Sequence, residues 1–193
     1  MGVSVEKCLQ AWTNSLRQIN AKADIVFFGD SLTYYGEFAS IIEDRKICNL
    51  GLRGDTLSGL KERIEQIVLL NPEIVFLMSG INDLSDHDEE GFEKKYLEIV
   101  NSILLRCPRV KLVLQSMLPV NDKSFCISCK HEQILAYNRI VRKIAFNYNL
   151  QYADLFSMYE HDGLLPYEDT VDGIHLKGEA YQKWYNYIQK FLR

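Results

Sequence analysis

Short apolar runs alternate with longer segments of helical periodicity along this sequence, and this alternation restricts the possible folds more than any other feature. The runs are rich in β-branched residues and short enough to be buried strands, at residues 25–29, 46–51, 74–79, 110–116 and 150–155. Strands that alternate with helices predict βαβ units, in which helices cover both faces of a parallel sheet. We therefore expect an α/β fold, a three-layer α/β/α sandwich around a parallel sheet of about five strands.

The segments between the runs carry apolar residues three or four positions apart, which is the spacing of one face of a helix. Three internal stripes comprise Leu57, Leu60, Ile64, Ile67 and Val68, then Phe92, Tyr96, Ile99, Val100 and Ile103, and finally Ile134, Val141, Ile144 and Ala145. Helices at the two ends of the chain are predicted from Val5, Cys8, Trp12, Leu16 and Ile19 and from Ala180, Trp184, Tyr187, Ile188 and Phe191. We expect each stripe to face the sheet.

The length and charge of the chain restrict its organisation and its partners. A chain of 193 residues is long enough for one sizeable core, and we expect a single domain over residues 1–193. The net charge of −4, without a cluster of Lys and Arg, argues against nucleic-acid binding. No apolar run reaches the roughly 20 residues that cross a bilayer, and the first 19 residues lack the pattern of a signal peptide. We expect a cytoplasmic protein without a membrane span.

Five cysteines in a chain without a recognisable leader favour free thiols over disulfides. Only Cys126 and Cys129 have a suggestive spacing, and His131 follows them closely. A C-x-x-C pair with a histidine could supply three zinc ligands, but no second pair of ligands has matching spacing. We expect a plain surface loop and no metal here, and the sequence leaves a redox role for the two thiols open.

Distinctive residues follow three of the predicted strands at the point where each strand ends. Asp30 and Ser31 directly follow the first run, and Gly51 ends the second. The segment GIND, which contains Asn82, directly follows the third. In an open parallel sheet the carboxyl ends of the strands meet at one edge, and ligands bind outside that edge. We therefore expect these residues to lie together. Asp and Ser are also common turn and helix-capping residues, so position alone does not assign them a function.

A serine nucleophile needs a base within hydrogen-bond reach, and the base needs a group that orients it. Among the four histidines, His175 lies directly before the closing helix, and Asp172 stands three residues upstream with Gly173 between them. This spacing lets the Asp172 carboxylate accept a hydrogen bond from one ring nitrogen of His175 while the other nitrogen faces a serine. A turn opened by Asp172 before a helix gives the same pattern, so the pair is informative only together with Ser31.

Acyl transfer also requires hydrogen-bond donors aimed at the negative charge that develops on the carbonyl oxygen. The backbone N–H of Ser31, at the start of a helix, is one candidate. The N–H of Gly51, unshielded by a side chain, and the side-chain amide of Asn82 are two more. Gly51 could instead be a turn glycine and Asn82 an Asx-turn residue. Their coincidence at one sheet edge favours a shared role.

Four segments, FFGDSLT, NLGLRGDT, GIND and DGIH, resemble in this order the four sequence blocks of the GDSL or SGNH hydrolases. None would be specific alone, but together they span residues 24–180. The resemblance implies a flavodoxin-like α/β/α sandwich, the SGNH hydrolase fold, which agrees with the alternation of strands and helices. It also implies hydrolysis of an ester without a metal or organic cofactor.

The resemblance implies a role for each of the residues singled out above. Ser31 would be the nucleophile, His175 the base and Asp172 the acid that orients it. Ser31, Gly51 and Asn82 would form the oxyanion hole. Asp30, directly before the serine, would position the loop rather than react, because Asp172 already fills the acid role.

The family includes lipases, lysophospholipases, thioesterases and carbohydrate O-acetylesterases, so membership leaves the substrate open. Within it, the segments NLGLRGDTLSGL, GIND and QSMLPVN look most like platelet-activating-factor acetylhydrolase-like proteins and sugar O-acetylesterases. We therefore expect a serine esterase that cleaves a small acyl ester, acetyl above all, of a carbohydrate or small metabolite. A lysophospholipase or thioesterase for longer acyl chains is the alternative, and an inactive ligand-binding protein of the same fold is a further one.

Several residues near the expected mouth of the site could contact the substrate: Asp30, Leu32, Tyr34, Tyr35, Arg53, Leu84 and Met117. Arg53 could pair with an anionic group of the substrate or form a structural ion pair. Tyr34 and Tyr35 could stack on a sugar ring or pack against the protein. The longest irregular segment, residues 117–131, follows the fourth strand, and the sequence indicates neither whether it closes over the site nor the oligomeric state.

Overall fold

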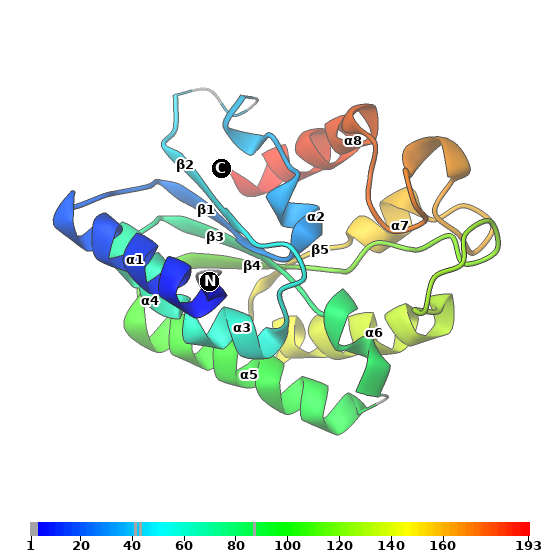
Figure 1. Cartoon of the computed structure of the whole chain (residues 1–193), viewed down its shortest axis with the longest axis horizontal. Coiled ribbons are helices and arrows are strands. Elements are labelled where there is room, and N and C mark those ends of the chain that lie inside the picture. Colours follow the sequence, from blue (N-terminus) through cyan, green and yellow to red (C-terminus); the bar gives the residue numbers. More distant parts are fainter. Residues whose placement is uncertain (1–3, 41, 43, 87) are drawn as a thin grey trace.

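Five parallel strands form one sheet through the centre of the molecule in a computed structural model, which describes residues 4–40, 42, 44–86 and 88–193 (Figure 1). The strands are β1 (Ile25–Gly29), β2 (Ile47–Gly51), β3 (Ile74–Met78), β4 (Lys111–Gln115) and β5 (Gln151–Ala153). Every neighbouring pair is parallel. Their order across the sheet is β2-β1-β3-β4-β5, the flavodoxin-like order, with a switch point between β1 and β3.

The central strands are buried on both faces, so their sequences are continuous apolar runs rather than alternating ones. All five residues of β1 and all five of β3 are buried. Successive side chains along β1 point to opposite faces of the sheet and enter two separate cores. Val26 and Phe28 pack in one core, and Ile25 and Phe27 pack in the other.

Helices cover both faces of the sheet (Figure 1). One face is covered by α1 (Val5–Gln18), α3 (Leu57–Glu62), α4 (Ile64–Leu70), α5 (Glu89–Arg106) and α6 (His131–Asn147). The other face is covered by α2 (Ser31–Tyr34), α7 (Leu155–Tyr159) and α8 (Gly178–Ile188). Short 3-10 turns lie at Phe38–Ser40, Ile81–Asp86, Tyr167–Asp169 and Gln189–Phe191. The expected three-layer α/β/α sandwich with a five-stranded parallel sheet is therefore confirmed.

The apolar stripe at residues 57–68 forms two short helices rather than one. Arg63 separates α3 from α4, and its φ of −111° lies outside the helical range. Its side chain is buried and donates to carbonyl groups at the ends of β1 and β2. The break in the helix thus coincides with a polar connection between this layer and the strand ends.

The first helix, α1, buries a different face from the one expected. Leu16 is buried as predicted, but Cys8 is exposed, Trp12 is 38% and Ile19 is 71% exposed, so the predicted stripe is wrong at these three positions. Thr13 is buried instead, because its hydroxyl donates to a carbonyl of the preceding turn and accepts from a glutamine side chain of α4. The side chain of Val5, the first residue of the stripe, lies outside the part of the chain that is described.

The segments that follow β1, β2 and β3 lie at the carboxyl edge of the sheet, together with the loop before α8 (Figure 1). The sheet topology thus brings polar side chains from distant parts of the sequence to one edge. Across the residues that the structure describes, none of the helices has the length and the apolar character needed to span a bilayer.

Candidate active site

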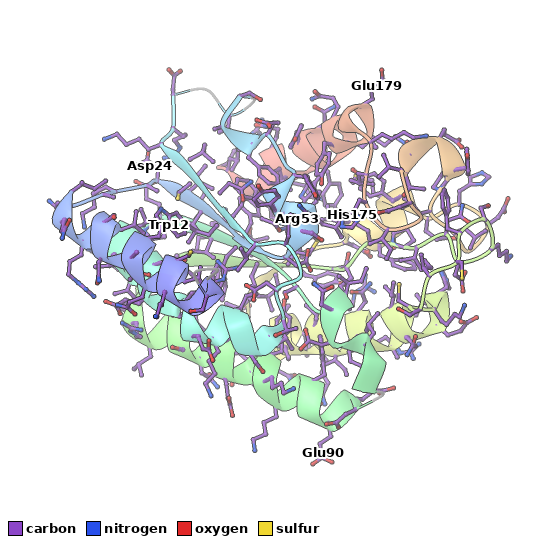
Figure 2. The ribbon with its side chains drawn as sticks, viewed as in Figure 1. Trp12, Asp24, Arg53, Glu90, His175 and Glu179 are labelled. Carbon is purple, nitrogen blue, oxygen red and sulfur yellow. The ribbon has the colours of Figure 1, made fainter. Side chains whose placement is uncertain are left out.

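Ser31, His175 and Asp172 form a continuous chain of hydrogen bonds at the carboxyl edge of the sheet. The Ser31 hydroxyl lies 2.8 Å from His175 Nε2, and His175 Nδ1 lies 2.7 Å from Asp172 Oδ2. Ser31 comes from the turn between β1 and α2, whereas the other two come from the loop before α8, where Figure 2 shows His175. The fold therefore joins two segments that are 144 residues apart in the sequence.

The turn that carries Ser31 is tight because Gly29 ends β1. A side chain at Gly29 would place its Cβ 2.2 Å from the carbonyl oxygen of Met78 on the neighbouring strand β3. Asp30 follows and caps α2, since its Oδ1 accepts the Leu32 N–H at 3.0 Å. Ser31 is thereby held in the first turn of α2, directly above the end of a buried strand.

The loop that carries His175 is closed by its own side chains. Asp172 Oδ1 accepts two backbone N–H groups, from Ile174 at 3.0 Å and from His175 at 2.8 Å. Gly173 adopts a φ of +91°, a left-handed conformation that suits glycine. Thr170 Oγ1 donates to the His175 carbonyl oxygen at 2.8 Å. These bonds fix both the backbone and the ring of His175.

Asp172 is held in its ionised form by these bonds. Its side chain is half exposed. Partial burial opposes ionisation. The hydrogen bonds from the backbone N–H and the ring of His175, together with that from the Ile174 N–H, outweigh this effect and hold the pKa of Asp172 below its usual value. A carboxylate here can accept a hydrogen bond from the protonated ring nitrogen of His175 and stabilise a positive charge on the ring.

The structure corrects the expectation for Gly51. Its backbone N–H donates to Asn49 Oδ1 at 2.8 Å, so this donor is already occupied within the chain. A Cβ at Gly51 would lie 2.1 Å from the backbone nitrogen of Tyr34, and the glycine is therefore required for the packing of β2 against α2. The sequence motif led to this strand end, and the N–H that it indicated is occupied.

Three other donors remain at this edge. Ser31 and Asn82 line the same cavity as His175. Among the described residues, the backbone N–H groups of Ser31 and Gly54 have no hydrogen-bond partner within the chain. Gly54 has a φ of +71°, and the next carbonyl, that of Asp55, accepts the Asn82 side-chain N–H at 2.8 Å. Asn82 and the Gly54 turn are thus held together.

Sequence reasoning missed a buried ion pair below the site. Arg63 is 3% exposed and pairs with Asp55 at 2.6 Å. Its guanidinium also donates to the carbonyl of Leu50 at 2.6 Å and to that of Gly29 at 2.9 Å. Arg63 therefore connects the end of β1, the end of β2 and the turn at Gly54 and Asp55, to which the Asn82 side chain donates. The sequence signal was weak, because Arg63 is one of four charged residues between positions 61 and 65.

Asp30 is buried beneath this edge rather than at its mouth. It is 1% exposed, so the expectation that it contacts substrate is wrong. Burial raises the pKa of Asp30 to about 7, the Leu32 N–H opposes the rise, and the carboxylates of Asp55 and Asp83 add to it. Its Oδ2 atom has no hydrogen-bond partner among the described residues. The capping bond to Leu32 gives Asp30 a structural role in the nucleophile turn.

The remaining mouth residues divide into buried and accessible ones. Leu32 and Met117 are each 1% exposed and belong to the two cores, so they also do not reach the solvent side of the site. Leu84 lines the cavity beside Ser31. Tyr34 is exposed, and Arg53 is exposed next to the loop of His175 (Figure 2).

A cavity of about 460 Å³ opens directly beside the serine. Its polar wall holds Ser31, Asn82, Gln133 and His175, and its apolar wall consists of Ile81, Leu84, Cys129 and Ile174. Cys129 is thus buried at the cavity, which corrects the expectation of a plain surface loop, whereas Cys126 is exposed. Both thiols are free.

Known proteins share both sequence and fold with this chain. The "Multidomain esterase" of Ruminococcus flavefaciens is 25% identical over 147 residues, which are 71% of this chain. The match covers 18% of that protein, so the chain spans less than a fifth of its length.

Solved structures with 25% identity or less show the shared fold. A protein from Streptococcus pneumonia, provisionally named a platelet activating factor, superposes with a TM-score of 0.86 at 23% identity, covering 98% of this chain and 94% of that one. The acetyl xylan esterase AlAXEase superposes with a TM-score of 0.75 at 22% identity, covering 88% of this chain and 99% of that one.

The family is established by a match over residues 27–183, which is most of the chain. The matched region begins within β1, before Ser31, and ends within α8, after His175. It includes all four segments whose resemblance pointed to the GDSL or SGNH hydrolases, and that resemblance is confirmed. The chain belongs to the GDSL-like lipase/acylhydrolase family.

Proposed function

We propose that this protein is a serine esterase that removes a small acyl group, acetyl above all, from a carbohydrate or small metabolite. The observation that carries the proposal is the hydrogen-bonded chain from Ser31 Oγ through His175 to Asp172, with distances of 2.8 and 2.7 Å. These are the distances that general-base activation of a hydroxyl requires. Membership of an acylhydrolase family supports the same reaction class.

The geometry supports a two-step reaction through an acyl-enzyme. His175 Nε2 takes the proton of the Ser31 hydroxyl as the oxygen attacks the ester carbonyl. The tetrahedral intermediate collapses, His175 gives the proton to the leaving alcohol, and the acyl group stays on Ser31. Water then attacks the acyl-enzyme with His175 as base, which releases the acid and restores the serine. Asp172 orients the ring and stabilises its positive charge in both steps.

The oxyanion would be bound by donors from three segments. We assign this role to the Ser31 N–H, to the Asn82 side-chain amide and to the Gly54 N–H in place of that of Gly51. One Asn82 N–H is bonded to the Asp55 carbonyl, which orients the amide, and the second hydrogen is available to the substrate. Fixed donors of this kind act where water is excluded and charge develops.

A longer acyl chain is a second candidate, because the cavity of about 460 Å³ beside Ser31 has an apolar wall. A small acyl group is supported by the fold shared with an acetyl xylan esterase, and ester hydrolysis by the sequence shared with a multidomain esterase. The partner in either case is a small ester, and the cytoplasmic location and single-domain organisation stay predictions.

Hydrolysis of p-nitrophenyl esters from acetate to octanoate tests the proposal. We expect the highest kcat/KM on acetate, a decline with chain length, and a loss of several orders of magnitude in Ser31→Ala. Ser128→Ala is the matched control, since it removes a hydroxyl from the same cavity without touching the hydrogen-bonded chain. A maximum on octanoate would favour the long-chain candidate. Equal activity of wild type and Ser31→Ala would refute the esterase mechanism.

A further inference from the structure

A second cavity shares His175 with the cavity beside Ser31. Its volume is about 560 Å³, and Tyr35, Arg53, Asp172, His175 and Gln182 are among the residues that line it. His175 lines both cavities, whereas Ser31 and Asn82 line only the first. His175 is therefore common to a cavity that includes the nucleophile and a cavity that includes residues of α8.

Arg53 presents an available positive charge to this second cavity. Its side chain is exposed, and it forms no ion pair with any described carboxylate. The alternative that Arg53 is a structural ion-pair residue is therefore not supported across the described part of the chain. In a protein with a net charge of −4, an exposed guanidinium without an ion-pair partner among the described residues is a candidate site for an anion.

Tyr35 connects this arginine to the catalytic loop. The guanidinium carbon of Arg53 lies 5.7 Å from the centre of the Tyr35 ring, a cation–π distance. The Tyr35 ring in turn meets the His175 ring edge-on, with 5.7 Å between centres and 87° between planes. Figure 2 shows Arg53 and His175 on the same side of the molecule, at the carboxyl edge of the sheet.

We propose that the second cavity binds the alcohol portion of the substrate and that Arg53 recognises an anionic group, a carboxylate or a phosphate, on that portion. This inference rests on the proposed esterase function. His175 must hand its proton to the leaving oxygen, so the alcohol departs on the side of His175 while the acyl group stays beside Ser31 and Asn82. Among the described residues of the lining, Arg53 is the one arginine or lysine, and the lining also holds the carboxylates of Glu37 and Asp172. Gln182 and Glu37 provide hydrogen-bonding groups for hydroxyls. The substrate class is an O-acyl ester of an acidic sugar or of a similar polyhydroxylated acid.

Three matched esters test the inference: methyl 3-O-acetyl-glucopyranoside, the corresponding glucuronide and the corresponding 6-phosphate. Release of acetate gives kcat/KM for wild type and for Arg53→Gln. We expect about tenfold higher kcat/KM for an anionic ester than for the neutral one, the size of one charge-assisted contact at a partly exposed site. Arg53→Gln should remove this preference, so that kcat/KM on the anionic esters falls to the value on the neutral one. Comparison of kcat/KM on the glucuronide and on the 6-phosphate shows whether a carboxylate or a phosphate is preferred.

Further variants separate recognition from structure. Arg53→Lys keeps the charge and should keep part of the preference, and the preference should shrink as ionic strength rises. Tyr35→Ala, which removes the ring that contacts Arg53, should reduce the preference for the anionic ester. Tyr35→Phe, which keeps the ring, should not. Arg109→Gln is the matched control, because Arg109 is an exposed arginine that precedes β4, at the opposite edge of the sheet.

The outcomes that overturn the inference differ from those that overturn the esterase function. Equal kcat/KM on the three esters, all dependent on Ser31, would refute anion recognition and leave the esterase intact. An equal loss on all esters in Arg53→Gln would show that Arg53 acts on the structure of the site instead. If wild type hydrolyses none of the three, nor any p-nitrophenyl ester from acetate to octanoate, the esterase function fails and the inference fails with it.

Discussion

At the scale of single residues, Asp172 combines two roles that a substitution can separate. Its Oδ1 atom accepts two backbone N–H groups of its own loop, and its Oδ2 atom accepts from the His175 ring. Asparagine at this position keeps an oxygen for the backbone bonds but offers an N–H to the ring, which favours the wrong ring tautomer. The structural and the chemical contribution of Asp172 are therefore distinguishable.

We expect Asp172→Asn to lower kcat by about 10⁴-fold while the protein stays folded, in line with the effect of removing the acid of such a triad. The measurement is kcat and KM on p-nitrophenyl acetate, with thermal unfolding followed in parallel. Asp162→Asn is the control, since Asp162 is an exposed aspartate outside the site. A loss of less than tenfold in Asp172→Asn would mean that another group orients His175.

At the scale of elements, the break between α3 and α4 places Arg63 under the strand ends. Arg63 and Asp55 form an ion pair whose side chains are 3% and 5% exposed. Removing one partner of such a pair leaves an uncompensated buried charge, whereas replacing both is far less costly. The pair therefore contributes more to the arrangement of β1, β2 and the Gly54 turn than to net stability.

We expect Arg63→Met to lower the free energy of unfolding by about 3–5 kcal/mol, because Asp55 then stays buried without its cation. In the double variant Arg63→Met/Asp55→Asn, much of that loss should be recovered. Urea unfolding of the wild type, both single variants and the double variant gives the coupling energy of the pair. Strictly additive losses would contradict the assignment of a buried ion pair.

The sequence predicted the strands well because their signal is local. The run at residues 25–29 coincides with β1, since burial on both faces selects an uninterrupted apolar stretch and Gly29 ends it. The helix break at Arg63 was not predictable in this way, because the apolar periodicity continues through it. Its cause is tertiary, namely the bonds from Arg63 to two strand ends. Thr13 in α1 is a second case, since its burial depends on a partner in another helix.

The site was predictable to the level of segments but not of atoms. Motif order and sheet topology together placed Ser31, Asn82 and His175 at one edge. Which backbone N–H group is unoccupied there depends on side chains such as Asn49, whose oxygen takes the Gly51 N–H. A pattern of residue types carries no information about such a competition between acceptors.

At the scale of the whole molecule, stability should depend on pH through the buried carboxyl group of Asp30. Its pKa is about 7 in the folded protein, against 3.8 for an ordinary aspartate. Below pH 4 the carboxyl is protonated in both states and contributes nothing to the pH dependence. Between pH 4 and 7 the unfolded chain releases this proton while the folded chain keeps it, so the free energy of unfolding falls as pH rises. Above pH 7 both states are ionised and the contribution levels off.

The variant Asp30→Asn isolates this contribution, because asparagine is also a good capping residue and retains the oxygen that accepts the Leu32 N–H. One unit of pKa corresponds to 1.36 kcal/mol, so relative to the variant the wild type should lose up to about 4 kcal/mol of unfolding free energy between pH 4 and 7. Urea unfolding at half-unit steps of pH measures both curves, and titrating groups that do not interact with Asp30 cancel in their difference. Parallel curves would mean that Asp30 is ionised throughout this range in the folded protein, with a charge compensated by Arg63 rather than by a bound proton.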